Sequence, residues 1–127
     1  MGHQEVQMKV YIAGPISGIE DYNRPEFKRA EKLLKSLGFE TINITDPCYI
    51  GVIKGMTEPK RWVKYMIRDL EILLTCDAIY FIRKWQESPG ARIERIVAER
   101  LGLFIFEERK VKQDKYMVCF IPPQPIK

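Results

Sequence analysis

The feature that most constrains the fold of this chain is a strand, a loop and a helix in direct succession. Residues 77–82 form an almost wholly apolar run that predicts a central strand of a parallel sheet. Residues 88–90 (Ser-Pro-Gly) predict a turn, and the apolar spacing over residues 90–101 predicts a helix. α/β proteins build anion-binding loops in this way, because a helix N-terminus presents free backbone N–H groups. Glu94 stands about one turn into this helix, and a carboxylate beside such a loop requires an explanation.

The rest of the chain repeats the alternation of strands and helices. Further helices are predicted from an N-cap at Asn23 to a C-cap at Gly38 and around residues 62–74. The further strands are predicted over residues 8–13, 39–44, 103–106 and 116–121. This order predicts an α/β fold, namely a Rossmann-like or flavodoxin-like three-layer sandwich with a mostly parallel five-stranded sheet.

Two further predictions concern the end of the chain and the buried face of the last helix. Residues 107–115 are expected to be a charged connection between the last two strands. The residues of the last helix that are expected to face the core are Ile93, Ile96, Val97 and Leu101.

Length and composition predict one globular domain. The chain has 127 residues, of which 46% are hydrophobic and 30% charged, and the domain is expected to cover residues 8–121. Residues 1–7 are polar and are expected to be a flexible N-terminus, and the Pro-rich residues 122–127 a C-terminal tail. No apolar run approaches the roughly 20 residues that span a bilayer, and the N-terminus lacks the apolar core of a signal peptide. A cytoplasmic protein is therefore expected.

Charge and cysteines limit the possible partners. The net charge of +4 suits an anionic small molecule or weak nucleic-acid contact. The charges alternate in sign along the predicted helices, whereas a duplex-binding surface would show a denser Lys/Arg cluster. Cys48, Cys76 and Cys119 match neither a zinc spacing nor a disulfide framework, and the last two are expected to be reduced core residues. We therefore expect no metal site, no membrane contact and no strong nucleic-acid binding.

Two loops are expected at the edge of the sheet where α/β proteins bind ligands, beyond the carboxyl ends of the strands. Residues 14–18 contain two glycines that could form a phosphate-binding nest or could simply make a strand-to-helix turn. Residues 83–90 form the second loop, in which Trp85 is the better candidate for stacking on a ligand, while Trp62 is expected to pack within its helix. The long segment over residues 45–60 is either a binding lid or a surface excursion.

Two carboxylates could carry chemistry at this edge. Taken alone, Glu94 is explained as favourable charge near a helix N-terminus, and Asp69 as an exposed polar residue paired with Lys64 or Arg68. Together they could form the kind of pair that cleaves glycosidic bonds. In that chemistry one carboxylate attacks or stabilises an oxocarbenium-like centre, and another group handles the leaving-group proton.

Three motifs resemble the nucleoside 2-deoxyribosyltransferase-like superfamily, which includes the 2′-deoxynucleoside 5′-monophosphate N-glycosidases. The motifs are Tyr11-Ile12-Ala13-Gly14-Pro15, Arg68-Asp69-Leu70 with Cys76-Asp77-Ala78, and Ser88-Pro89-Gly90-Ala91-Arg92-Ile93-Glu94. The resemblance covers residues 9–106 and is nearest to small uncharacterised bacterial and phage members. It implies cleavage or transfer at the N-glycosidic bond of a nucleoside or nucleotide, without metal or organic cofactor, by a homodimer or larger homo-oligomer.

The resemblance also implies a role for each matching residue. Glu94 matches the nucleophile that forms a covalent intermediate with C1′ of the sugar. Asp69 matches the aspartate that engages the sugar and nucleobase and assists proton transfer, and Tyr11 matches an aromatic residue that lines the pocket. The residues that match ligand-contacting loop positions are Gly14, Pro15, Ser17, Gly18, Ser88 and Gly90.

Ser88 bears on the substrate. Transferases of free nucleosides tend to have an acidic residue at this position, whereas the monophosphate hydrolases have a serine that can bind the 5′-phosphate. The resemblance therefore implies a nucleotide ligand rather than a nucleoside. Arg92 could bind phosphate or lie on the surface.

The resemblance thus implies an N-glycosidase or deoxyribosyltransferase, and this mechanism requires a polar pocket that keeps Glu94 ionised at neutral pH while Asp69 handles a proton. A non-catalytic nucleotide-binding or sensing module would keep the same loops without turnover. A nucleic-acid accessory protein rests on the positive charge alone, and it predicts oligonucleotide binding that weakens steeply with salt.

Overall fold

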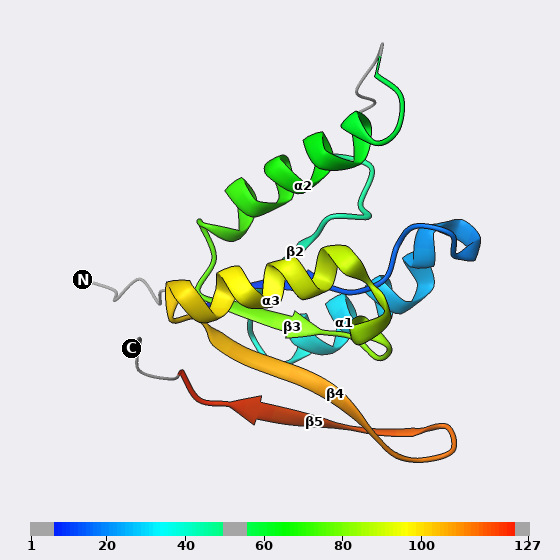
Figure 1. Ribbon diagram of the computed structural model, residues 1–127. Coiled ribbons are helices and arrows are strands. Elements are labelled where there is room, and N and C mark those ends of the chain that lie inside the picture. The colour runs from blue at the N-terminus through cyan, green and yellow to red at the C-terminus, as the bar shows by residue number, and fades with distance from the viewer. Residues whose placement is uncertain (1–6, 50–55, 124–127) are drawn as a thin grey trace.

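A five-stranded sheet forms the centre of the molecule (Figure 1). The computed structural model describes residues 7–49 and 56–123, so the segments expected to be a flexible N-terminus and a C-terminal tail lie largely outside the described residues. The strand order is β2-β1-β3-β4-β5. The first four strands are parallel, and β5 is antiparallel to β4. The strands are β1 (Lys9–Ala13), β2 (Glu40–Asn43), β3 (Ala78–Phe81), β4 (Phe104–Lys112) and β5 (Lys115–Ile121).

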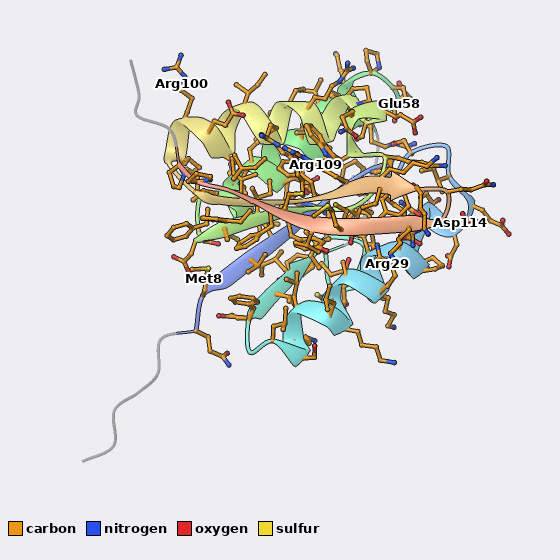
Figure 2. The ribbon with its side chains drawn as sticks, turned by 90° about the horizontal axis from the view of Figure 1, so that it is seen from below. Met8, Arg29, Glu58, Arg100, Arg109 and Asp114 are labelled. Carbon is orange, nitrogen blue, oxygen red and sulfur yellow. The ribbon has the colours of Figure 1, made fainter. Side chains whose placement is uncertain are left out.

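Helices cover both faces of this sheet, as Figure 2 shows with α1 on one side and α3 on the other. The helices are α1 (Arg24–Ser36), α2 (Lys60–Leu73) and α3 (Pro89–Leu101), with short 3₁₀ turns η1 (Glu20–Asn23) and η2 (Trp85–Glu87). α2 and α3 pack against each other, on the face opposite α1. The predicted α/β sandwich with a mostly parallel five-stranded sheet is therefore confirmed.

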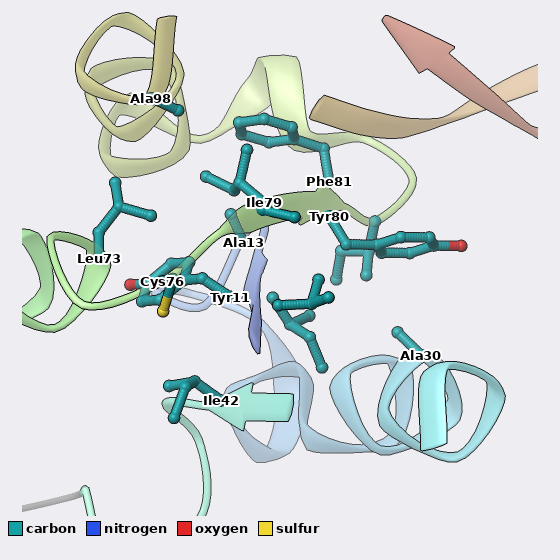
Figure 3. Packing of buried hydrophobic residues seen from close by; sticks show 14 of the residues in the cluster. Tyr11, Ala13, Ala30, Ile42, Leu73, Cys76, Ile79, Tyr80, Phe81 and Ala98 are labelled. Atoms are coloured by element: carbon teal, nitrogen blue, oxygen red, sulfur yellow. The ribbon is translucent and has the colours of Figure 1, made fainter. Parts of the chain in front are cut away.

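The core lies around the two central strands. Every residue of β3 and the last four residues of β1 are buried, as expected for parallel strands covered on both faces. Tyr11 and Tyr80 leave these neighbouring strands toward opposite faces (Figure 3). Because the strand order reverses between β1 and β3, the loops that follow them open a crevice at the carboxyl edge, which is the usual ligand site of such sheets.

The face that α3 turns to the sheet differs from the predicted one. Its buried residues are Ala91, Glu94 and Ala98, whereas the side chain of Ile96 is 62% exposed and Ile93 and Leu101 are also exposed. The prediction that these three apolar residues face the core is wrong, and only Val97 among the predicted set packs against it. Small side chains let the helix lie close to the sheet, and this spacing also carries Glu94 inward.

The predicted charged connection over residues 107–115 is also wrong. β4 continues through it to Lys112, and the chain reverses at Asp114, which has a φ of +58°. Glu107 and Glu108 are both buried in this strand. Their carboxylates are paired with arginines on opposite faces of the sheet, Glu107 with Arg95 at 2.7 Å and Glu108 with Arg29 at 2.8 Å.

Candidate active site

A cavity of about 530 Å³ lies beyond the carboxyl ends of β1 and β3. It is enclosed by the loop after β1, the end of β2, one face of α2 and the first turn of α3. The residues that line it are Gly14 to Ser17, Tyr22, Ile44, Thr45, Glu58, Arg61, Trp62, Tyr65, Met66, Asp69, Glu87 to Ala91 and Glu94. The two carboxylates singled out in the sequence therefore meet in one cavity.

Glu94 is held in place by a hydrogen bond from Tyr11 on β1. The Tyr11 hydroxyl donates a short hydrogen bond to Oε2 of Glu94, and both side chains are buried. Burial raises the pKa of Glu94 to about 8; the nearby charge of Asp69 also raises it, while the Tyr11 hydrogen bond lowers it. Burial together with the charge of Glu94 raises the pKa of Tyr11 well above its usual value. Tyr11 is therefore a neutral phenol that donates to Glu94.

This pKa differs from the expected behaviour of Glu94. An ionised carboxylate at neutral pH is expected from the sequence, but a pKa of about 8 leaves the protonated form in roughly tenfold excess at pH 7. The cause is the position of Glu94 on the close-packed side of α3, where only 4% of the residue is exposed. A proton therefore has to leave Glu94 before this carboxyl can act as a nucleophile.

Asp69 is the second buried carboxylate of the cavity. It lies on α2 and is 8% exposed, and burial raises its pKa while Arg68 lowers it. Two N–H groups of Arg68, Nη2 at 2.9 Å and Nε at 3.2 Å, donate to Oδ1 of Asp69. The Asp69 carboxylate is thus buried and its charge is partly balanced by Arg68. On a solvent-facing helix it would instead be exposed.

Two glycines of the cavity lie where the chain is closely packed, Gly14 directly after β1 and Gly90 in the first turn of α3. A Cβ on Gly14 would lie 2.2 Å from Cγ1 of Ile82, so only glycine lets the exit of β1 pass the end of β3. A Cβ on Gly90 would lie 3.2 Å from Sδ of Met66, where α3 approaches α2. Ser88 is the N-cap of α3, and its Oγ accepts a hydrogen bond of 3.1 Å from the N–H of Ala91.

Most of the predicted ligand-contacting residues reach the cavity, but three do not. Gly14, Pro15, Ser17, Ser88 and Gly90 line it, and Glu94 and Asp69 do so as well. Gly18 is in the same loop with a φ of +76° but does not line the cavity, and Tyr11 contacts Glu94 without lining it. Trp85 packs on Phe81, with ring centroids 4.7 Å apart, and lies outside the lining.

The positions of the two tryptophans are therefore the reverse of those predicted. Trp62 lines the cavity, whereas Trp85 is a packing residue whose indole ring has the Arg95 guanidinium 5.2 Å from its centroid. Arg92 is exposed and outside the cavity lining. Of the segment over residues 45–60, Thr45 and Glu58 line the cavity, while residues 50–55 lie outside the described residues.

Several cavity residues were not singled out as ligand contacts in the sequence. Trp62, Tyr65 and Met66 are among them. They recur at helical spacing with Asp69, which the sequence had assigned to the site, so this shared helix face was a usable signal. Tyr22 gave no such signal. It lies in a run of three left-handed residues with φ values between 52° and 59°. Asn23, which ends this run, donates from its side chain to the carbonyl of Pro15 at 2.9 Å instead of capping α1.

The described part of the chain shows neither a cluster of metal ligands nor a membrane-spanning helix. Over residues 7–49 and 56–123, no three His, Cys, Asp or Glu side chains gather as a metal ion would need. Within the same ranges, no helix has the length and apolar character that crossing a membrane requires.

A comparison with family models decides the family. The model described as "Domain of unknown function (DUF4406)" matches residues 8–107, which include both cavity carboxylates. The chain belongs to this family. A comparison of this DUF4406 protein with curated proteins finds no match.

Solved structures with a similar fold include enzymes. The 2-deoxyribosyltransferase of Bacillus psychrosaccharolyticus is 21% identical with a TM-score of 0.60, over 78% of this chain and 70% of that one. The 2-deoxyribosyltransferase of Leishmania mexicana is 21% identical with a TM-score of 0.56, over 79% of this chain and 63% of that one. A conserved protein from Enterococcus faecalis V583 is 18% identical with a TM-score of 0.59, over 87% of this chain and 68% of that one.

At these identities the likeness concerns the fold. It confirms that the DUF4406 protein has the nucleoside 2-deoxyribosyltransferase-like fold that its motifs predicted. The Leishmania protein is substantially longer, since the matched region spans less than two thirds of it.

Proposed function

We propose that this protein cleaves the N-glycosidic bond of a nucleotide or nucleoside, with Glu94 as the nucleophile and Asp69 assisting proton transfer. The observation that carries the proposal is the convergence of the Tyr11–Glu94 pair and Asp69 at one cavity. The fold, shared with two 2-deoxyribosyltransferases, supports the reaction class.

In the proposed reaction a Glu94 oxygen attacks C1′ of the sugar as the bond between C1′ and the base nitrogen breaks. The product is a glycosyl ester of Glu94 and a base that has gained one proton. A Glu94 with a pKa of about 8 must lose a proton before it attacks, and the departing base needs one. We assign the transfer of this proton to Asp69, because Asp69 is the other buried carboxyl group in the lining of the cavity.

Tyr11 has a specific part in this scheme. Its hydroxyl donates to Glu94 Oε2, so it stabilises the carboxylate form and fixes the orientation of the attacking group. Water or a second base then attacks C1′ of the ester and releases Glu94, which gives hydrolysis or transfer respectively. Both outcomes share the covalent step and differ only in the acceptor.

A 5′-phosphorylated substrate is the finer part of the proposal. The Oγ of Ser88 accepts from the N–H of Ala91, which leaves the serine O–H to donate to a ligand oxygen. The N-terminus of α3 lies at the same place. Arg61 also lines the cavity, but its charge is paired with that of Glu58 at 3.0 Å. The serine hydroxyl and the helix N-terminus are therefore the features that favour a phosphate on the ligand.

The test measures by chromatography the release of free base from a panel of deoxynucleoside monophosphates and the matching nucleosides. We expect the native protein to release base and Glu94→Gln to release none. Glu71→Gln is the matched control, because Glu71 is an exposed carboxylate on α2 outside the cavity lining. Equal rates and affinities for nucleosides and nucleotides would contradict the phosphate assignment.

A non-catalytic nucleotide-binding module is the second candidate. The raised pKa of Glu94 favours it, because a protonated carboxyl binds polar ligands but does not attack carbon. This candidate predicts thermal stabilisation by a nucleotide without base release at any pH between 6 and about 9.

A further inference from the structure

Asp69 has a partner that the proposed function does not use. We propose that Arg68 is a positioning residue, which holds Asp69 by one carboxylate oxygen and anchors it to the segment after β2 so that the other oxygen faces the ligand. The inference rests on the proposed function for its catalytic consequence, but the Arg68–Asp69 contact can be tested separately.

The geometry of the pair is unusual for a helix. Adjacent residues project about 100° apart around a helix axis and do not normally face each other. Arg68 nevertheless folds back on its neighbour, with Nη2 at 2.9 Å and Nε at 3.2 Å from the same atom, Oδ1 of Asp69. Both hydrogen bonds end on Oδ1, so among the described residues Oδ2 is left for a ligand in the cavity that Asp69 lines.

Two further contacts hold the guanidinium in this position. Its Nη1 donates a short hydrogen bond to the backbone carbonyl of Tyr49, in the segment that follows β2. Its Cζ lies 5.1 Å from the ring centroid of Tyr65, one helical turn earlier on α2. Of the three N–H groups that Arg68 directs at oxygen atoms, two hold Asp69 on the same helix and one joins α2 to the segment after β2.

An arginine is suited to this role and a lysine is not. A guanidinium presents its N–H groups in a rigid plane, so it can serve a carboxylate and a carbonyl at the same time. An ammonium would supply the charge but could not reproduce both contacts with fixed geometry. Arg68→Lys therefore separates the charge of Arg68 from its geometry.

The charged groups near Asp69 show what the loss of Arg68 would change. Arg68 on α2 is its positive partner, and the charge of Asp69 raises the pKa values of Glu94 on α3 and Tyr11 on β1. Removing Arg68 leaves Asp69 buried opposite Glu94 without a counter-charge. The pKa of Asp69 then rises, and the freed side chain loses its fixed orientation.

The experiment compares Arg68→Met and Arg68→Lys with the native protein and with Lys64→Met, a control at an exposed lysine on the same helix. Carboxyl ¹³C NMR titration of Asp69 is the readout that needs no activity, and base release against pH gives kcat and KM. We expect Arg68→Met to raise the Asp69 pKa and to lower kcat about 100-fold, with a smaller change in KM. Arg68→Lys should restore the pKa more than it restores kcat.

The outcomes separate the two proposals. An unchanged Asp69 titration in Arg68→Met would overturn the positioning role, whether or not the protein releases base. A raised Asp69 pKa in Arg68→Met, together with a native protein that releases no base, would uphold the Arg68–Asp69 contact and contradict the proposed function. If Arg68→Met does not fold, the comparison of Arg68→Lys with Lys64→Met decides, and an identical Asp69 titration together with an identical kcat in these two variants would overturn the proposal.

Discussion

Replacing Tyr11 with phenylalanine tests how the buried nucleophile is ionised. The change removes one hydroxyl from a fully buried ring and leaves the packing in place. The lost hydrogen bond ends on a carboxylate, and such bonds contribute about 1.5–3 kcal/mol. At 1.36 kcal/mol per unit, this corresponds to a further rise of about 1–2 units in the pKa of Glu94, whose present value is about 8.

A higher pKa of Glu94 should lower the activity at neutral pH. The ionised fraction of Glu94 at pH 7 falls about 10- to 100-fold, and base release at that pH should fall by the same factor. At higher pH the loss should shrink, because both proteins then approach full ionisation. The measurement is kcat/KM for base release against pH, which should keep its shape and move to higher pH in Tyr11→Phe.

The chain offers a matched control. Tyr80 is also a buried tyrosine of a central strand, and it donates to Glu108 at 2.7 Å on the opposite face of the sheet, away from the cavity. Tyr80→Phe therefore removes the same atom from a similar pair. We expect it to lower the melting temperature without moving the pH profile. Equal profiles for Tyr11→Phe and the native protein, or equal shifts in both variants, would refute the reasoning.

Three further predictions concern stability and binding. Gly14→Ala should lower the free energy of unfolding by about 1–3 kcal/mol in chemical denaturation, because its Cβ would overlap Ile82; native-like stability would contradict the packing at this turn. Trp62→Ala should weaken nucleotide binding in calorimetry, whereas Trp85→Ala should lower the melting temperature and leave affinity unchanged; the reverse pattern would restore the sequence-based assignment. Glu94 has a folded pKa of about 8, above its usual 4.5, so its contribution to stability is complete below about pH 4.5 and is lost as the pH rises toward 8. Glu94→Gln should therefore gain stability relative to the native protein between pH 5 and about 9, by up to the order of 5 kcal/mol, and a constant difference across that range would contradict the raised pKa.

The fold was predictable because its determinants are local. The apolar runs of β1 and β3, the helical spacing of α1 and the glycines after the helices are read directly from neighbouring residues. The position of Glu94 after β3 was predictable for the same reason, since a loop and one helical turn separate it from the strand. Its convergence with Asp69, which lies in the second half of α2, depends on the packing of α2 against α3.

The errors concern residues whose partners are distant in the chain. Glu108 is buried because Arg29 and Tyr80, 79 and 28 residues away, pair with it, and no local pattern reveals such a contact. The face of α3 was misassigned because close approach to the sheet favours Ala91 and Ala98 over larger apolar residues. Hydrophobicity alone does not measure how much space a packed interface leaves.

The prediction of which tryptophan lies at the cavity was wrong for a related reason, while the contact of either one with a ligand stays a prediction. Trp85 lies in the loop next to Ser88, which made it the natural candidate for a ligand contact. Its ring instead covers Phe81 and the Arg95 guanidinium. Trp62 is far from that loop in sequence, but the packing of α2 beside α3 brings it to the cavity.

The central claim is that Glu94 attacks the sugar, and intact-mass spectrometry of the protein quenched during turnover tests it most directly. The account predicts a glycosyl adduct that peptide mapping places on Glu94, present in the native protein and in Glu71→Gln. The adduct should be absent in Glu94→Gln, which should also release no base. Base release by Glu94→Gln at the native rate, with no adduct in any variant, would contradict the account.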